Sequence, residues 1–348
     1  MDKDVYNPNK FILHKDALVK IANREFVPPV NFQIDLTNKC NNRCLWCFYD
    51  VYPLPEFTRK QVLDKDKLFA FLEDLKVIGG QSIEWTGGGE PTMHPDFVEI
   101  VNKARELGFH QAMVTNGKKL SGDIADVVKD FDWVRVSLNS ASAKMYKIQH
   151  GNDSFLRVIN NIECFSKIKA SNCVLGVSMI VDKNNWIEIA DMTYLAKKNL
   201  GADNARIGIP QTPENEKLFE GIWDKVVEKM EKADSYQEDN FSVFTFSNRI
   251  EVLSHKTTSK RCYYHHLTPS LGANGVIYPC CHFKYLPEYN LGNINETPFS
   301  ELWEGPVRKS FIDSTGENCK ASCWFNDKNK LADYIIKKPE DVPHLAYP

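Results

Sequence analysis

Short apolar runs alternate with amphipathic stretches between about residues 30 and 210 of the chain. The runs are rich in β-branched and aromatic residues and have the length of buried strands. Six strands are predicted, at residues 32–36, 82–85, 111–115, 133–138, 174–181 and 205–209. Helical spacing of apolar residues separates them, at 65–77, 95–107, 123–129, 155–168 and 186–198.

Strands that alternate with helices form a parallel sheet, and right-handed crossovers make successive units curl in one direction. We therefore expect an α/β protein whose core is a partial (β/α)6 TIM-like barrel, with a smaller C-terminal domain. In such a barrel the reactive groups lie at the carboxyl ends of the strands.

The pattern changes after the sixth strand. Residues 213–233 read as one charged helix, to which we assign no function, and residues from 261 onward combine turn residues, aromatics and five cysteines with one helical stretch at 299–311. We predict an N-terminal extension (1–30), the barrel (31–212), a connecting helix and strand (213–260), a metal-binding domain (261–330) and a C-terminal tail (331–348).

Charge and cysteine content narrow the class of protein. With 43 Lys and Arg against 46 Asp and Glu, the net charge is -3, which offers no general attraction for a nucleic-acid polymer or an anionic membrane,. No secretory signal and no apolar run long enough to span a membrane is visible, so we expect a soluble cytoplasmic protein.

Ten cysteines in a reducing compartment favour metal binding over disulfides,. The isolated Cys164 and Cys173 are expected to be buried small hydrophobes.

Three cysteines follow the first predicted strand on an eight-residue loop: Cys40, Cys44 and Cys47. Three thiolates can bind three corners of a [4Fe-4S] cluster and leave one iron open. The alternative is a zinc site whose fourth ligand, such as a distant histidine, is supplied by folding.

This C-x3-C-x2-C loop, with Trp46 before its last cysteine, resembles the radical S-adenosylmethionine superfamily. Gly88, Gly89 and Glu90 follow the second strand, where that family places a GGE motif that receives the methionyl ammonium of the cofactor. By the same resemblance, Ser137 and Asn139 at the fourth strand end face its ribose or carboxylate. The resemblance implies reductive cleavage of S-adenosylmethionine to a 5'-deoxyadenosyl radical, hydrogen abstraction from a substrate carbon, and a reducing partner such as flavodoxin or ferredoxin.

The second cysteine group resembles the SPASM/twitch extension of these enzymes. Cys262, Gly275 and Cys280 form a C-x12-G-x4-C stretch with a hairpin turn at Asn274 and Gly275, and Cys319 and Cys323 follow. A full SPASM domain has more cysteines, which favours the shorter twitch form with one auxiliary [4Fe-4S] cluster held by these four thiolates. A zinc ribbon is the alternative.

Cys281 adjoins a proposed ligand but is not needed to complete the four. Successive strand residues point to opposite faces, so Cys281 would turn away from the auxiliary cluster and toward substrate. There it could donate a hydrogen atom to a substrate radical; the alternatives are a packing role or a ligand role.

We expect the net reaction to be oxidation of a small molecule, with the auxiliary cluster accepting an electron. Epimerisation and modification of a ribosomal peptide are the alternatives; the short N-terminal extension has no room for an independent leader-binding domain, which favours a small molecule. A non-catalytic zinc-stabilised binding protein is the alternative from another class.

Overall fold

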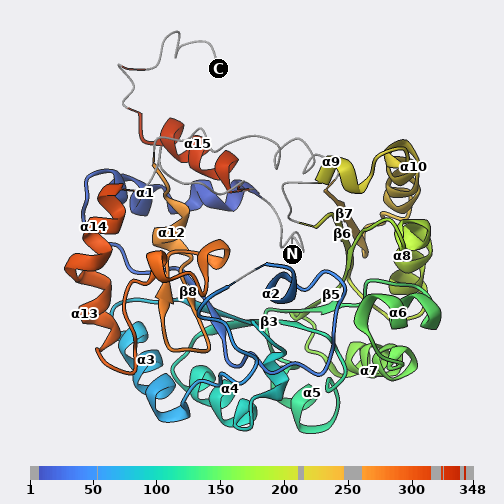
Figure 1. The fold of residues 1–348 in the computed structure, drawn as a ribbon, viewed down its shortest axis with the longest axis horizontal. Coiled ribbons are helices and arrows are strands. Elements are labelled where there is room, and N and C mark those ends of the chain that lie inside the picture. Colours follow the sequence, from blue (N-terminus) through green and yellow to red (C-terminus); the bar gives the residue numbers. More distant parts are fainter. Residues whose placement is uncertain are drawn as a thin grey trace.

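A single curved sheet organises the chain (Figure 1). The computed structural model describes residues 8–52, 54–210, 215–246, 261–314, 323, 325–337 and 341. The sheet has nine strands in the order β7-β6-β5-β4-β3-β2-β1-β8-β9. The strands are β1 (Asn31–Asp35), β2 (Ser82–Thr86), β3 (His110–Thr115), β4 (Trp133–Ser137), β5 (Val174–Ile180), β6 (Asn204–Gly208), β7 (Ser242–Thr245), β8 (Ser270–Leu271) and β9 (Ile277–Tyr278).

All neighbours from β7 to β8 are parallel, as six consecutive strand–helix units require, and only β8 and β9 are antiparallel,. The predicted α/β partial barrel is confirmed, and each of its six strands lies within about a residue of the predicted bounds. The structure adds β7, which carries the parallel order one strand further.

Helices cover the outer face of this sheet (Figure 1). They are α3 (Lys65–Val77), α4 (Phe97–Glu106), α5 (Gly122–Val128), α6 (Ala143–His150), α7 (Phe155–Ile168), α8 (Ile189–Lys198) and α10 (Trp223–Asp234), with the 3-10 turns η2 (Pro91–Met93) and η3 (Trp186–Glu188). The sequence did not predict α6, because the side chains that it buries include the polar Gln149 and His150.

The main core lies between the strands and these helices. On β4, for example, Val134 and Val136 are fully buried, whereas Arg135 and Ser137 on the other face are half-buried. The same alternation occurs on β2. One face of the sheet therefore carries the apolar packing, and its concave face is left for polar side chains.

Two predicted helices are each broken into two. The stretch expected at 213–233 contains α9 (Asn215–Leu218) and α10, separated by Gly221 in a left-handed conformation at φ 74°; residues 211–214 lie outside the described residues. The stretch expected at 299–311 contains α13 (Phe299–Glu304) and α14 (Pro306–Ser314). Pro306 causes the second break, because it has no N–H to donate and disfavours a helical conformation at Gly305.

The C-terminal segment joins the sheet beside the strand that leads to the three-cysteine loop. β8 pairs with β1, with Gln33 opposite Ser270, and β9 returns antiparallel to β8. Gly275 in the intervening turn has φ 80°, which confirms the predicted hairpin turn at Asn274 and Gly275,. The remaining short elements are α2 (Phe48–Val51), α12 (Tyr264–Leu267), η4 (Cys281–Phe283) and η5 (Pro287–Tyr289).

A second, smaller core joins the first and last helices that the structure describes. The N-terminal η1 (Pro8–His14) and α1 (Lys15–Ala22) pack against α12 and α15 (Asn326–Ile335), so that Leu18 and Ile21 bury beside Leu267 and Ala332. Within the described ranges, no helix has the length and apolar character needed to cross a membrane.

Candidate active site

The three-cysteine loop leaves β1 at the carboxyl edge of the sheet, and each of its thiols is partly exposed. Several groups of the chain approach these sulfurs. The Asn42 backbone N–H donates to Cys40 Sγ over 3.4 Å, and Arg59 Nη2 donates to Cys47 Sγ over 3.1 Å. Cys44 Sγ lies 3.2 Å from His150 Nδ1.

The thiols are close enough to influence one another. Burial, and after it the nearby Cys40 and Cys47, raises the pKa of Cys44 to about 12, and burial also raises the pKa of Cys40. Three adjacent thiolates need a positive partner to be stable, and N–H donors aimed at sulfur are typical of iron–sulfur sites. The donor set therefore fits a [4Fe-4S] cluster, which Cys40, Cys44 and Cys47 would hold. In the described part of the chain, no three His, Cys, Asp or Glu side chains are grouped as a single-ion site.

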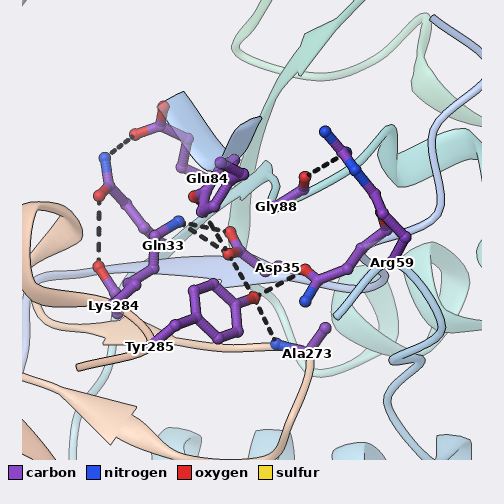
Figure 2. Close-up of polar contacts among 11 residues, drawn as sticks. Gln33, Asp35, Arg59, Glu84, Gly88, Ala273, Lys284 and Tyr285 are labelled. Carbon is purple, nitrogen blue, oxygen red and sulfur yellow. Dashed lines mark hydrogen bonds and ion pairs between the residues drawn. The ribbon is translucent and has the colours of Figure 1, made fainter. Parts of the chain in front are cut away.

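The glycines of the second strand end press directly against this loop. A Cβ on Gly88 would lie 1.9 Å from Asn38 Oδ1, and one on Gly89 would lie 2.2 Å from the Lys39 carbonyl oxygen. Arg59 Nη1 also donates to the Gly88 carbonyl oxygen over 3.1 Å (Figure 2). Only glycine allows the two backbones to approach so closely.

Glu90 is buried, and its carboxylate binds groups at the end of the neighbouring strand, β3. Its carboxylate accepts from Thr115 Oγ1 over 2.7 Å, from Thr92 Oγ1 over 2.7 Å and from the Asn116 N–H over 2.7 Å. Burial raises the pKa of Glu90, and these hydrogen bonds oppose that effect. The chain itself thus supplies hydrogen-bond partners to this carboxylate. The contact with the methionyl ammonium that the resemblance implies stays a prediction.

Of the residues expected at the fourth strand end, Ser137 lies half-buried on the concave side of β4. Asn139 adopts φ 57°, and its Oδ1 accepts from the Ile180 N–H over 2.8 Å. Asn139 thereby ties the end of β4 to that of β5. Trp46 Nε1 donates to Asp182 Oδ2 over 2.6 Å, just beyond the end of β5.

A cavity of about 370 Å³ opens at this edge of the sheet. Trp46 and Tyr49 line it from the first cysteine group, and Cys281 and His282 line it from the second. Charged side chains from the strands complete it, namely Glu84 on β2, Arg135 on β4 and Arg206 on β6, together with Lys284 of the C-terminal segment. Both cysteine groups therefore border one polar cavity.

Asp35, the last residue of β1, connects this strand to the C-terminal segment (Figure 2). Lys284 Nζ lies 2.7 and 2.8 Å from its two carboxylate oxygens, and both side chains are buried. The Tyr285 hydroxyl lies 2.9 Å from Asp35 Oδ2 and 2.8 Å from Asn38 Oδ1, and it accepts from the Ala273 N–H over 3.0 Å. Burial alone would lower the pKa of Lys284, but Asp35 raises it above its ordinary value.

In the second group, Cys280 is half-buried, and desolvation raises the pKa of its thiol. Cys281, Cys262 and Cys323 are near enough to raise that pKa further. Three of the four expected ligands are thus brought together, and Cys319 lies outside the described residues. Cys281 lies in the cavity wall, and burial raises its pKa to about 11, so that it is a thiol near neutral pH.

The other two cysteines differ from each other. Cys173 is buried as expected, whereas the expectation for Cys164 is wrong, since it is exposed on α7. Sequence reasoning also missed Arg59, Asp182 and the pair Asp35–Lys284. A carboxylate at a strand end was a signal for the two aspartates, but nothing local in the sequence distinguishes Arg59 or Lys284 from a surface cation.

Two family models match the chain. Residues 34–195 match the model of the radical SAM superfamily, and residues 262–324 match SPASM, an iron–sulfur cluster-binding domain. The first domain binds S-adenosylmethionine and a [4Fe-4S] cluster, and the second binds auxiliary iron–sulfur clusters.

Curated relatives match little more than half of the chain. A probable GTP 3',8-cyclase of Saccharolobus islandicus (strain M.14.25 / Kamchatka #1) is 30% identical over 182 residues, which are 52% of this chain and 56% of that protein. A probable GTP 3',8-cyclase of Pyrococcus abyssi is 28% identical over 200 residues, which are 56% of this chain and 62% of that protein. The chain therefore spans little more than half the length of these relatives.

Solved structures share the fold over most of the chain. SuiB of Streptococcus suis bound to its precursor peptide SuiA is similar with a TM-score of 0.64 and 14% identity, over 90% of this chain and 73% of that one. Tagged anSMEcpe with bound AdoMet is similar with a TM-score of 0.62 and 16% identity, over 89% and 93% of the two chains.

Proposed function

The chain belongs to the radical S-adenosylmethionine superfamily, and on that premise we propose that it oxidises a substrate held in the cavity between its two cysteine groups. The observation that carries this proposal is the shared cavity. Trp46 of the first group and Cys281 of the second border the same 370 Å³ space. A substrate there is within reach of both groups.

In this proposal Cys40, Cys44 and Cys47 hold the first cluster. Arg59 donates to Cys47 Sγ and positions the glycine turn against the loop through Gly88. When bound, the cluster and S-adenosylmethionine supply a 5'-deoxyadenosyl radical that abstracts a hydrogen atom from the substrate. The strand ends and the cavity walls fix which carbon is presented, because proximity and orientation supply much of the rate.

Oxidation requires the substrate to lose one further electron and one proton after the hydrogen atom. Cys262, Cys280 and Cys323, with Cys319 from the sequence, would hold the auxiliary cluster that takes this electron. His282 and Lys284, which follow Cys280 in the sequence, line the cavity. The substrate is proposed to be a small molecule, or the side chain of a peptide of similar size; the similarity to SuiB, solved with its precursor peptide, supports the second.

The test separates the two groups by their metal content. In Cys319→Ala/Cys323→Ala, iron should fall by about four atoms per chain, while the dithionite-reduced protein should still form 5'-deoxyadenosine. Cys164→Ala, which removes an exposed thiol, is the matched control. A loss of zinc with iron unchanged would make the C-terminal site structural and would reject the auxiliary cluster.

A redox-neutral reaction is the second candidate, and the position of Cys281 favours it. Its thiol lines the same cavity, so it could return a hydrogen atom to a substrate radical. Cys281→Ala should then keep its full iron content and lose turnover, and the unmodified enzyme should place solvent deuterium in its product. Loss of iron would instead identify Cys281 as a ligand, and unchanged turnover would identify it as packing.

A further inference from the structure

Acidic and cationic side chains enter the cavity from different strands. Among the described residues that line it, one is acidic, Glu84 on β2, and three are cationic, namely Arg135 on β4, Arg206 on β6 and Lys284. Lys284 is neutralised by Asp35, whose carboxylate oxygens lie 2.7 and 2.8 Å from its Nζ. Two arginines against one glutamate therefore leave these lining side chains with a formal net charge of +1.

The register of the sheet places the three unneutralised charges on its concave face beside short side chains. Residues that pair across a parallel register project to the same face of a sheet. The pairs are Glu84 with Ala112 of β3, Arg135 with Gly176 of β5, and Arg206 with Ser178 of β5. Long charged side chains on β2, β4 and β6 thus alternate with short ones on β3 and β5, which leave room for a ligand between the charges.

Each of the two guanidinium groups lies over an aromatic ring. Arg135 Cζ is 5.5 Å from the centroid of the Trp133 ring, and Arg206 Cζ is 4.9 Å from the centroid of the Phe246 ring. An arginine can contact an aromatic face and bind a carboxylate through its N–H edge at the same time. Its fork of N–H donors also matches the two oxygens of a carboxylate.

We propose that the substrate carries a carboxylate, which Arg135 and Arg206 bind. This inference rests on the proposed function, because it names the chemical class of the substrate in the same cavity. One carboxylate balances the net charge of +1, whereas a phosphate dianion exceeds it. Gln33 Nε2 donates to Glu84 Oε2 over 2.9 Å and holds that carboxylate on β2 (Figure 2). Glu84 repels the substrate anion and so turns it toward β4 and β6.

The positions of the arginines along their strands give the bound substrate a direction. Arg135 and Arg206 each lie two residues before the last residue of their strand. A carboxylate bound there lies inside the barrel, below the strand ends. The rest of the substrate then extends toward the strand ends, where Trp46 and Cys281 line the cavity.

The experiment measures the binding of small probes to the full-length, anaerobically reconstituted protein by isothermal titration calorimetry, with S-adenosylmethionine at saturation. The probes are 3-phenylpropanoate, its neutral isostere 3-phenylpropanamide, and 2-phenylethyl phosphate; their shared phenyl group suits a cavity lined by aromatic side chains. The test variant is Arg135→Gln/Arg206→Gln. The control is Arg157→Gln/Lys198→Gln, which removes the same charge at exposed positions on α7 and α8.

The unmodified protein and the control should bind 3-phenylpropanoate at least about tenfold more tightly than 3-phenylpropanamide, and the arginine variant should lose this preference. Glu84→Gln should tighten the binding of 3-phenylpropanoate, because it removes a repelling charge. A cavity that the substitutions merely distort would instead bind the acid more weakly in both variants. The opposite directions therefore separate recognition of charge from an effect on cavity shape.

Equal affinity of the unmodified protein for the acid and the amide would overturn the proposal, and so would an unchanged preference in the arginine variant. Tighter binding of 2-phenylethyl phosphate than of 3-phenylpropanoate would reject a carboxylate. A loss of S-adenosylmethionine binding in the arginine variant with full iron content would show that the arginines bind the cofactor, which also overturns the proposal. The proposed function fails separately, if the unmodified protein forms no 5'-deoxyadenosine with dithionite.

Discussion

At the scale of single residues, Arg59 links three parts of the candidate site. It donates to Cys47 Sγ and to the Gly88 carbonyl oxygen, and it pairs with Asp50 over 2.7 Å. A cationic donor at sulfur stabilises the reduced, more negative form of a cluster and so raises its reduction potential. In the proposed site the side chain would act on the cluster through Cys47, and it also holds the loop in place.

We predict that Arg59→Gln lowers the midpoint potential of the first cluster and slows dithionite-supported cleavage of S-adenosylmethionine about tenfold. A redox titration followed by electron paramagnetic resonance measures the potential. Lys60→Gln is the control, because it removes the same charge from the next residue, which is exposed. An unchanged potential with full iron content would contradict the role given to Arg59.

At the scale of elements, the sequence predicted the repeated strand–helix units well. It did not predict the last strand, β7, or the points where a helix is broken. The six strands and α3 and α7 were predicted because each buries a regular apolar pattern. β7 is a four-residue strand whose residues are all half-buried, so it carries no such pattern. The break between α13 and α14 depends on one Gly-Pro step within an otherwise continuous helical pattern.

The contact between the second strand end and the loop gives a prediction at this scale. Gly89→Ala should separate the two backbones, because its Cβ would meet the Lys39 carbonyl oxygen at 2.2 Å. Iron bound by the first site and 5'-deoxyadenosine formation should both fall, the latter at least about tenfold. Gly122→Ala is the control, since a Cβ there meets nothing within 4 Å. Its left-handed φ of 53° predicts a cost of about 1 kcal/mol in stability and no loss of iron,. Equal iron in both variants would show that the close contact is not needed.

At the scale of the whole molecule, the Asp35–Lys284 pair fastens the C-terminal segment to β1. The ligand types and their loop positions were visible in the sequence, but this pair joins residues 249 positions apart and only folding reveals it. Because both side chains are buried, removing one partner leaves an uncompensated charge,.

We predict that Lys284→Met destabilises the protein by about 3–5 kcal/mol, and that Asp35→Asn/Lys284→Met recovers part of that loss. Thermal unfolding of the reconstituted proteins under anaerobic conditions measures the order of stabilities. A double variant as unstable as the sum of the two single variants would show that the two residues act independently.

The most direct test of the central claim is 5'-deoxyadenosine formation by the dithionite-reduced protein with and without the first cysteine group. The unmodified protein should release 5'-deoxyadenosine from S-adenosylmethionine. Cys40→Ala/Cys44→Ala/Cys47→Ala should release none and should hold about four fewer irons per chain. Cleavage of S-adenosylmethionine by the triple variant at the unmodified rate would contradict the assignment of this loop as the cluster site.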